Sequence, residues 1–139
     1  MEKVLIEVIG TQNIDSQFDK TELKTAGTFE ELEEKYIIRY KEEQGEGEAP
    51  VDVSVVVLKD ESVVEMTRNG AISSRLVIER SQRNLCHYGT AYGDIPVAVY
   101  TREVLVEESE KGGEMRLDYD VFVGGERTAA TVMTLTWRL

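Results

Sequence analysis

The feature that most constrains the fold is an alternation of apolar and polar residues through residues 51–139, divided only by short turns. In the last run, one set of alternate positions holds Ala129, Thr131, Met133, Leu135 and Trp137. Side chains that alternate with a period of two belong to strands that bury one face. Many such strands in succession form an antiparallel sheet, which must close or pack on a second sheet to protect its edges. The pattern predicts an all-β protein.

The length and charge of the chain restrict its organisation and its partners. With 139 residues, it is expected to form a single domain over residues 1–139. It carries 27 acidic residues against 16 lysines and arginines, a net charge of −11. Nucleic-acid phosphates and anionic lipid headgroups repel such a chain. We therefore expect no nucleic acid and no membrane among its partners, and we interpret the acidity as a solvated surface.

Cysteine content and the start of the chain indicate the compartment. The single cysteine, Cys86, cannot form an internal disulfide. A strand pattern begins with the first residues, and there is neither a secretory signal nor a long apolar stretch. These features predict a cytoplasmic protein, either a monomer or a homodimer.

Turn signals divide the chain into about ten strand runs. Residues 4–9 are expected to form the first strand, residues 11–20 a loop, and residues 51–59 a well-buried strand. Asn69-Gly70 is the strongest hairpin signal, because both residues tolerate positive φ. Further turns are predicted at Gly93-Asp94, Lys111-Gly112-Gly113 and Gly124-Gly125. Residues 95–107 would then present on one face Ile95, Val97, Val99, Thr101 and Leu105.

Residues 28–43 fit two different structures. Apolar residues recur at helical spacing, and Thr28 with Glu31 resembles a capping box, which favours a helix. Alternatively, residues 21–32 form one strand, Glu33-Glu34-Lys35 a turn, and the residues that follow a second strand. The pattern alone does not distinguish the helix from the two strands.

Five short segments, taken in order, carry a resemblance to a known family. They are Thr25-Ala26-Gly27, residues 36–43, residues 66–70, residues 88–93 and Leu117-Asp118-Tyr119. Together they resemble the YwiB-like proteins, small uncharacterised bacterial proteins grouped as a domain of unknown function. The resemblance implies two strands between residues 21 and 43, and a closed antiparallel β-barrel of the calycin kind, like lipocalins and fatty-acid-binding proteins. It brings no established activity and no catalytic residues.

Arg68 is the residue from which a binding site is predicted. Small β-barrels can hold one ligand inside, and Arg68 shares a strand face with Val64 and Met66. If that face is buried, Arg68 points into the barrel or its mouth, where a desolvated guanidinium needs a carboxylate or a bound anion. The side chains that could complete the site are Tyr40, Tyr88, Thr90, Tyr92 and Tyr119. This set predicts a site for a small amphipathic or apolar anionic ligand.

The tail of such a ligand is expected to lie against Val55, Val57, Met133 and Leu135. The alternatives stay open. In the alternative interpretation, Arg68 lies in solvent or pairs with an internal carboxylate such as Glu30, and the tyrosines are core residues with hydrated tips. A filled barrel would then serve as a protein-interaction or structural module.

Residues for catalysis are scarce. His87 is the single histidine and has no partners at metal-ligand spacing, so we expect no metal site. Cys86 has no neighbouring cation in the sequence, and we expect it to be buried and inert. Adjacent carboxylates such as Glu107-Glu108 face opposite sides of a strand and make no catalytic pair. The chain is therefore predicted to be no enzyme and to need no cofactor.

Overall fold

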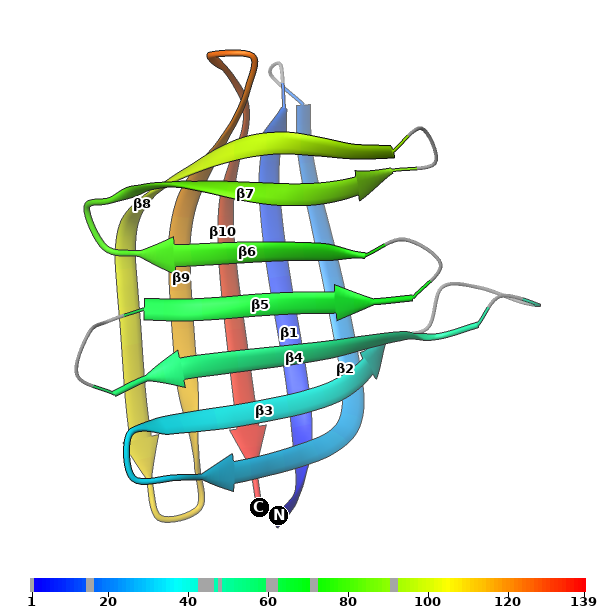
Figure 1. Cartoon of the computed structure of the whole chain (residues 1–139). Helices are drawn as coiled ribbons and strands as arrows, with labels where there is room; N and C mark the ends of the chain where they lie inside the picture. Colours follow the sequence, from blue (N-terminus) through cyan, green and yellow to red (C-terminus); the bar gives the residue numbers. More distant parts are fainter. Residues whose placement is uncertain are drawn as a thin grey trace.

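A computed structural model describes residues 2–14, 17–42, 47, 49–59, 63–70, 73–90 and 93–139 (Figure 1). Within this part of the chain, ten strands pair antiparallel with their neighbours and close into one barrel. Around the barrel their order is β1-β10-β9-β8-β7-β6-β5-β4-β3-β2. The strands are β1 (Glu2–Ile14), β2 (Gln17–Glu31), β3 (Lys35–Glu42), β4 (Val51–Leu58), β5 (Val63–Asn69), β6 (Ser74–Glu79), β7 (Arg83–Thr90), β8 (Gly93–Ser109), β9 (Gly112–Val123) and β10 (Glu126–Arg138). The predicted closed antiparallel barrel of about ten strands is confirmed.

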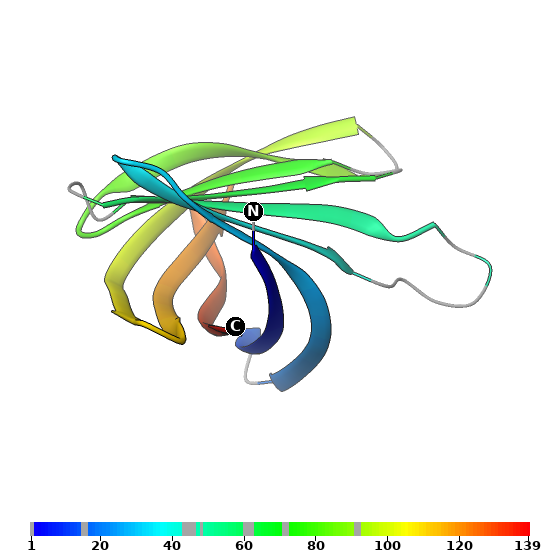
Figure 2. The same ribbon diagram turned by 90° about the horizontal axis from the view of Figure 1, so that it is seen from below.

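The barrel is flattened into two layers whose strands cross at a steep angle. Strands β3 to β7 form the first layer, and β1, β2, β9 and β10 form the second (Figures 1 and 2). Strands β2 and β8 are long enough to join both layers. The first part of β2 pairs with β1 and its last residues pair with β3, while β8 pairs with both β7 and β9. The space between the layers holds the core.

Residues 28–42 form two strands and no helix, and Glu43 lies outside the described residues. Strand β2 ends at Glu31 and β3 begins at Lys35, as the family resemblance implied. The apolar residues at helical spacing face each other across this hairpin: the rings of Phe29 and Tyr36 stack with centroids 5.7 Å apart. Strand β3 has a ladder partner on both sides, β2 and β4, which satisfies its backbone without a helix.

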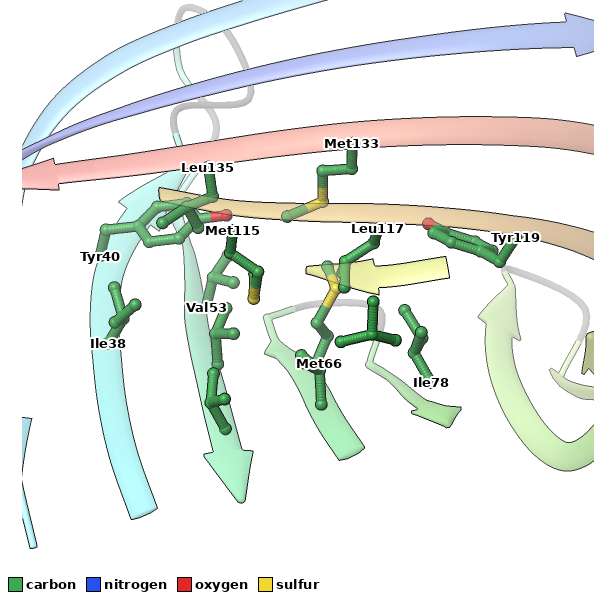
Figure 3. Packing of buried hydrophobic residues seen from close by; sticks show 14 of the residues in the cluster. Ile38, Tyr40, Val53, Met66, Ile78, Met115, Leu117, Tyr119, Met133 and Leu135 are labelled. Carbon is green, nitrogen blue, oxygen red and sulfur yellow. The ribbon is translucent and has the colours of Figure 1, made fainter. Parts of the chain in front are cut away.

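The inner face of β10 is the one that the sequence predicted. Ala129, Thr131, Met133, Leu135 and Trp137 are all buried, and Figure 3 shows Met133 and Leu135 packed among side chains of the first layer. The Trp137 ring stacks on Phe29 with centroids 5.6 Å apart. The core cluster extends from Val4 and Ile6 in β1 to Cys86 in β7.

The predicted inner face of residues 95–107 is correct only from Val97 to Thr101, since Ile95 is 39% exposed. Val97, Val99 and Thr101 are buried, but Leu105 is 44% exposed and Val104 is buried in its place. The register of β8 against β9 shifts by one residue between Thr101 and Glu103. Because such a bulge inserts one extra residue, every side chain beyond it changes face.

Residues 11–14 and 17–20 belong to strands β1 and β2 and not to the predicted loop, whose two remaining residues lie outside the described part of the chain. The β1/β2 ladder continues to the pair Ile14 and Gln17, and residues 5–13 of β1 also pair with β10. The expectation was wrong because this end of the hairpin borders the open end of the barrel. Its inward positions therefore carry polar residues, which hide the alternation.

Several predicted turns also need correction. Neither Asn69 nor Gly70 has positive φ, and Asn69 is the last residue of β5, so they make no tight hairpin. Gly93 begins β8 instead of lying in a turn. The turn before β9 is at Glu110-Lys111, so Lys111 was predicted correctly, while Gly112 and Gly113 belong to the strand. The turn at Gly124-Gly125 is confirmed, with φ of +60° and +86°. Among the described residues there is no helix with the length and apolar character needed to cross a membrane.

Candidate functional site

One end of the barrel interior holds a cavity of about 470 Å³, called here the mouth cavity. Eight of the ten strands contribute described residues to its wall, from both layers. Its apolar wall consists of Val8, Leu23, Met66, Leu76, Val97, Val121 and Met133. Its polar wall includes Gln12, Asp19, Thr21, Glu22, Glu42, Arg68, Ser74, Tyr119 and Thr131. An interior with one apolar and one polar side suits an amphipathic molecule.

Strand register explains how these polar side chains come together. In the second layer, neighbouring strands align Asp19, Gln12, Thr131, Tyr119 and Thr101 in one cross-strand row. In the first layer, the corresponding row contains Tyr40, Val53, Arg68 and Ser74. The two rows lie in opposite layers of the barrel at the same end, so residues distant in sequence surround one space.

Arg68 borders the mouth cavity and is paired with a carboxylate. Its Nη2 atom lies 3.3 Å from Oε2 of Glu42, with 39% of the Arg68 side chain and 27% of the Glu42 side chain exposed. The partner is thus Glu42 and not Glu30, which sequence analysis gave as an example. Alternation alone could have pointed to Glu42, because it lies two residues beyond Tyr40 on the same strand face.

Tyr40 and Tyr119 are both buried, and their hydroxyl groups point into the core cluster from opposite sides (Figure 3). Burial raises the pKa of Tyr40 to about 12, an effect that the Arg68 charge partly opposes and the Glu42 charge reinforces. Tyr40 therefore lies within electrostatic range of the ion pair, behind the wall of the cavity.

This raised pKa predicts a loss of stability at high pH. Above pH 10 the unfolded chain ionises its tyrosines, whereas folded Tyr40 keeps its proton until about pH 12. Because the unfolded state then binds fewer protons, the Tyr40 contribution to stability is lost as pH rises from 10 through 12, by about 1.4 kcal/mol at pH 11. Urea unfolding at pH 9 and pH 11 measures this loss. The Tyr40→Phe variant should lose about 1.4 kcal/mol less stability than the wild-type protein over this pH range. An equal loss in both proteins would contradict the raised pKa of Tyr40.

Thr131 is the most unusual polar group at the cavity. The residue is 5% exposed, and its hydroxyl makes no hydrogen bond with any group in the described part of the chain. Thr101, in the same cross-strand row, also has a buried hydroxyl without a hydrogen-bond partner among the described residues. A buried polar group without a partner costs about 1–3 kcal/mol and therefore calls for an explanation. Sequence analysis missed Thr131 because it is one polar residue in an otherwise apolar face.

Other predicted site residues lie outside what the structure describes or outside the cavity. The backbones of Tyr88 and Thr90 belong to β7, where Tyr88 pairs with Ser74, but their side chains are not described. Tyr92 lies outside the described residues. Of the predicted tail contacts, only Met133 borders the cavity. The other three, Val55, Val57 and Leu135, are closed within the core.

The opposite end of the interior is capped by aromatic rings. Phe29 stacks between Tyr36 and Trp137, and the Lys59 ammonium lies 4.6 Å from the centre of the Tyr36 ring. The Tyr36 hydroxyl donates a hydrogen bond to Glu108, which raises the pKa of Tyr36 to about 12. This packing separates the core from solvent at the end away from the mouth cavity.

Cys86 and His87 occupy opposite faces of β7. Cys86 is buried as predicted, and this burial raises the pKa of its thiol. Two residue pairs join β6 and β7 in the described chain. Outside these pairs, the Val77 N–H donates a hydrogen bond to the Cys86 Sγ at 3.3 Å. His87 is exposed. Among the described residues, no three histidine, cysteine or acidic side chains gather in a group that could hold a metal ion.

Comparison with known proteins places this barrel in a family. The sequence profile of a domain of unknown function, DUF1934, matches residues 6–135. The chain belongs to this family. An uncharacterised β-barrel protein of Bacillus subtilis (strain 168), YwiB, is 24% identical to this DUF1934 chain over 135 residues, which are 97% of this chain and 88% of YwiB. The predicted membership of a YwiB-like family is thus confirmed.

A solved structure supports the fold of this DUF1934 protein. The crystal structure of the YwiB protein from Bacillus subtilis superimposes with a TM-score of 0.84 at 21% sequence identity. The match covers 98% of this chain and 90% of the solved chain. At this level of identity the likeness concerns the β-barrel fold alone.

Proposed function

We propose that this DUF1934 protein is a non-catalytic barrel that binds one small amphipathic molecule in the mouth cavity. The observation that carries the proposal is Thr131, a residue that lines the cavity and whose buried hydroxyl has no hydrogen-bond partner among the described residues. A cavity of about 470 Å³ also falls within the usual size range of small-molecule sites. A ligand that bonds to the hydroxyl would compensate its desolvation.

The two sides of the cavity suggest how the ligand lies. Its apolar part would contact Leu23, Met66 and Leu76, which come from three strands of the two layers. Its polar head would reach the end of the cavity formed by the Arg68–Glu42 pair, Tyr119 and Thr131. Because Arg68 already has a carboxylate partner, it does not act as a lone cation awaiting an anion, and the charge of the head group is argued below.

A cavity-filling variant tests this proposal. N-phenyl-1-naphthylamine, an uncharged fluorescent amphiphile, is expected to bind the wild-type protein in a saturable one-to-one manner. Leu23→Trp should fill the cavity and weaken this binding at least tenfold. Leu105→Trp is the matched control, because Leu105 is exposed on the outside of β8, and should bind as wild type does. Circular dichroism and urea unfolding establish that each variant is folded.

Two results of this experiment would contradict the proposal. One is equal binding of the probe by wild type and a folded Leu23→Trp variant. The other is no binding by wild type, together with no small molecule retained in native mass spectrometry of the purified protein. A retained molecule released by denaturation would instead support it and identify the ligand class.

The Arg68–Glu42 ion pair favours a second candidate function. A guanidinium that already has a carboxylate partner needs no ligand, as expected for a structural or protein-interaction module without a small-molecule site. On this hypothesis, Arg68→Leu lowers the free energy of unfolding by about 1–2 kcal/mol, since both charges are partly exposed. The probe would also fail to bind wild type, which distinguishes this function from the first.

A further inference from the structure

We propose that the mouth cavity selects an amphiphile with an ammonium head group over the matching carboxylate. This inference rests on the proposed function, because it names the ligand class of the same site. It reverses the sign that Arg68 alone suggests in the sequence, and it follows from the charges that surround Arg68 in the folded barrel.

The described side chains that line the cavity are more acidic than basic. Asp19, Glu22 and Glu42 contribute three carboxylates, against the one guanidinium of Arg68. Glu22 is offset by Lys20, whose Nζ lies 3.1 Å from its Oε1, and both are well exposed. Glu42 offsets Arg68. Asp19 remains, so these charges sum to one negative charge at the rim, within a protein of net charge −11.

Binding an anion at Arg68 would disrupt the existing ion pair. The incoming carboxylate would have to displace Glu42, whose side chain is only 27% exposed. Glu42 would then be left partly desolvated and beside a second negative charge, which is unfavourable. An ammonium group approaches the pair from its carboxylate side and leaves the contact between Arg68 and Glu42 intact. The cation therefore binds without this penalty.

The uncharged groups of the site accept either head group, so they do not oppose the selection. The Thr131 oxygen can accept a hydrogen bond from an ammonium N–H, and its O–H could equally donate to a carboxylate. The ring of Tyr119 borders the cavity and can additionally favour a cation near its face. Thr131 thus marks where the head group lies, while Glu42 and Asp19 determine its sign.

Matched amphiphiles test the sign directly. Octylamine, octanol and octanoate each contain one unbranched chain of eight carbons and differ in head-group charge at pH 7. Each is titrated against the protein–N-phenyl-1-naphthylamine complex at low ionic strength. Octylamine is expected to displace the probe about tenfold more tightly than octanoate, with octanol between them, and added salt should narrow the difference. Tighter binding of octanoate would overturn the inference and leave the proposed function standing.

Two charge-removing variants separate the cavity from the overall charge. Glu42→Gln should weaken the binding of octylamine and strengthen the binding of octanoate, because the substitution removes a carboxylate from the cavity and leaves Arg68 without its ion-pair partner. Glu65→Gln is the matched control: Glu65 pairs with Arg75 at 2.7 Å, and neither residue lines the mouth cavity. Equal effects of the two variants would assign the preference to net charge and overturn the inference. Failure of all three amphiphiles and of the probe itself would instead refute the proposed function.

Discussion

Replacing Trp137 with alanine is expected to lower the free energy of unfolding by about 3–5 kcal/mol, the largest loss among single substitutions in this barrel. Trp137 is 1% exposed and stacks on Phe29 in the aromatic cap. It also packs closely against the backbone of β9, because a Cβ atom added to Gly113 would fall 2.7 Å from the indole Cη2. Side chains around the deleted ring cannot collapse fully, so a cavity remains.

Urea unfolding followed by far-UV circular dichroism measures this loss, since the substitution removes the sole tryptophan. Arg138→Ala is the control, because the neighbouring Arg138 is exposed and its replacement should change stability by less than about 0.5 kcal/mol. A loss below about 1 kcal/mol for Trp137→Ala would show that the aromatic cap contributes little to the fold.

Replacing Gly27 with alanine is expected to destabilise the protein by about 3 kcal/mol, at the upper end of the usual cost of overpacking. Gly27 pairs with Val4 of β1 on one side and with Tyr40 of β3 on the other, where the pairing of β2 with β3 begins. An added Cβ atom would overlap the carbonyl oxygen of Arg39 and Cδ1 of Ile6, and would lie 3.2 Å from Cβ of Tyr40. The first of these is backbone, so β2 and β3 would have to separate.

Gly10→Ala provides a matched comparison on the adjacent strand. The Cβ atom added there meets only Oγ1 of Thr21, at 3.1 Å, and this side chain can rotate away. We expect a change of less than about 1 kcal/mol for Gly10→Ala, measured by the same urea unfolding. Similar losses for the two variants would mean that close strand approach at Gly27 is not the cause. Glycine is needed at residue 27 for space, since its φ is not in the positive region.

Much of the barrel could be predicted from local patterns. The inner face of β10 and the Gly124-Gly125 turn depend only on residues that are close in sequence, and both were predicted correctly. The helix-like spacing of Phe29 and Tyr36 shows the limit of this reasoning. Their separation in sequence fits one helical face, yet the same separation also places two residues across a short hairpin. The family resemblance resolved that ambiguity, and the residue pattern did not.

Other features depended on contacts between strands. The bulge at residue 102 that exposes Leu105 lies beside ion pairs from Arg102 to Asp118 and Asp120, and the alternation along β8 gives no sign of it. The polar end of the β1/β2 hairpin was predicted to be a loop. Its residues are polar because they border the cavity, which the sequence pattern does not reveal. Such positions are defined by neighbours that lie far away in sequence.

For the candidate site, the strand face that Arg68 shares with Val64 and Met66 followed from the sequence by itself, whereas the burial of that face and the surroundings of Arg68 did not. Arg68 faces inward with Val64 and Met66 because alternate side chains of a strand share a face, a consequence of local backbone geometry. Its neighbours depend on the register of β3, β4 and β5 and on the closure of the barrel, which together set Glu42 beside it and bring Tyr119 and Thr131 to the same cavity. Local alternation therefore determined which residues share a strand face. Only the tertiary structure decided which charges meet there, because register and closure arise from packing across the whole barrel.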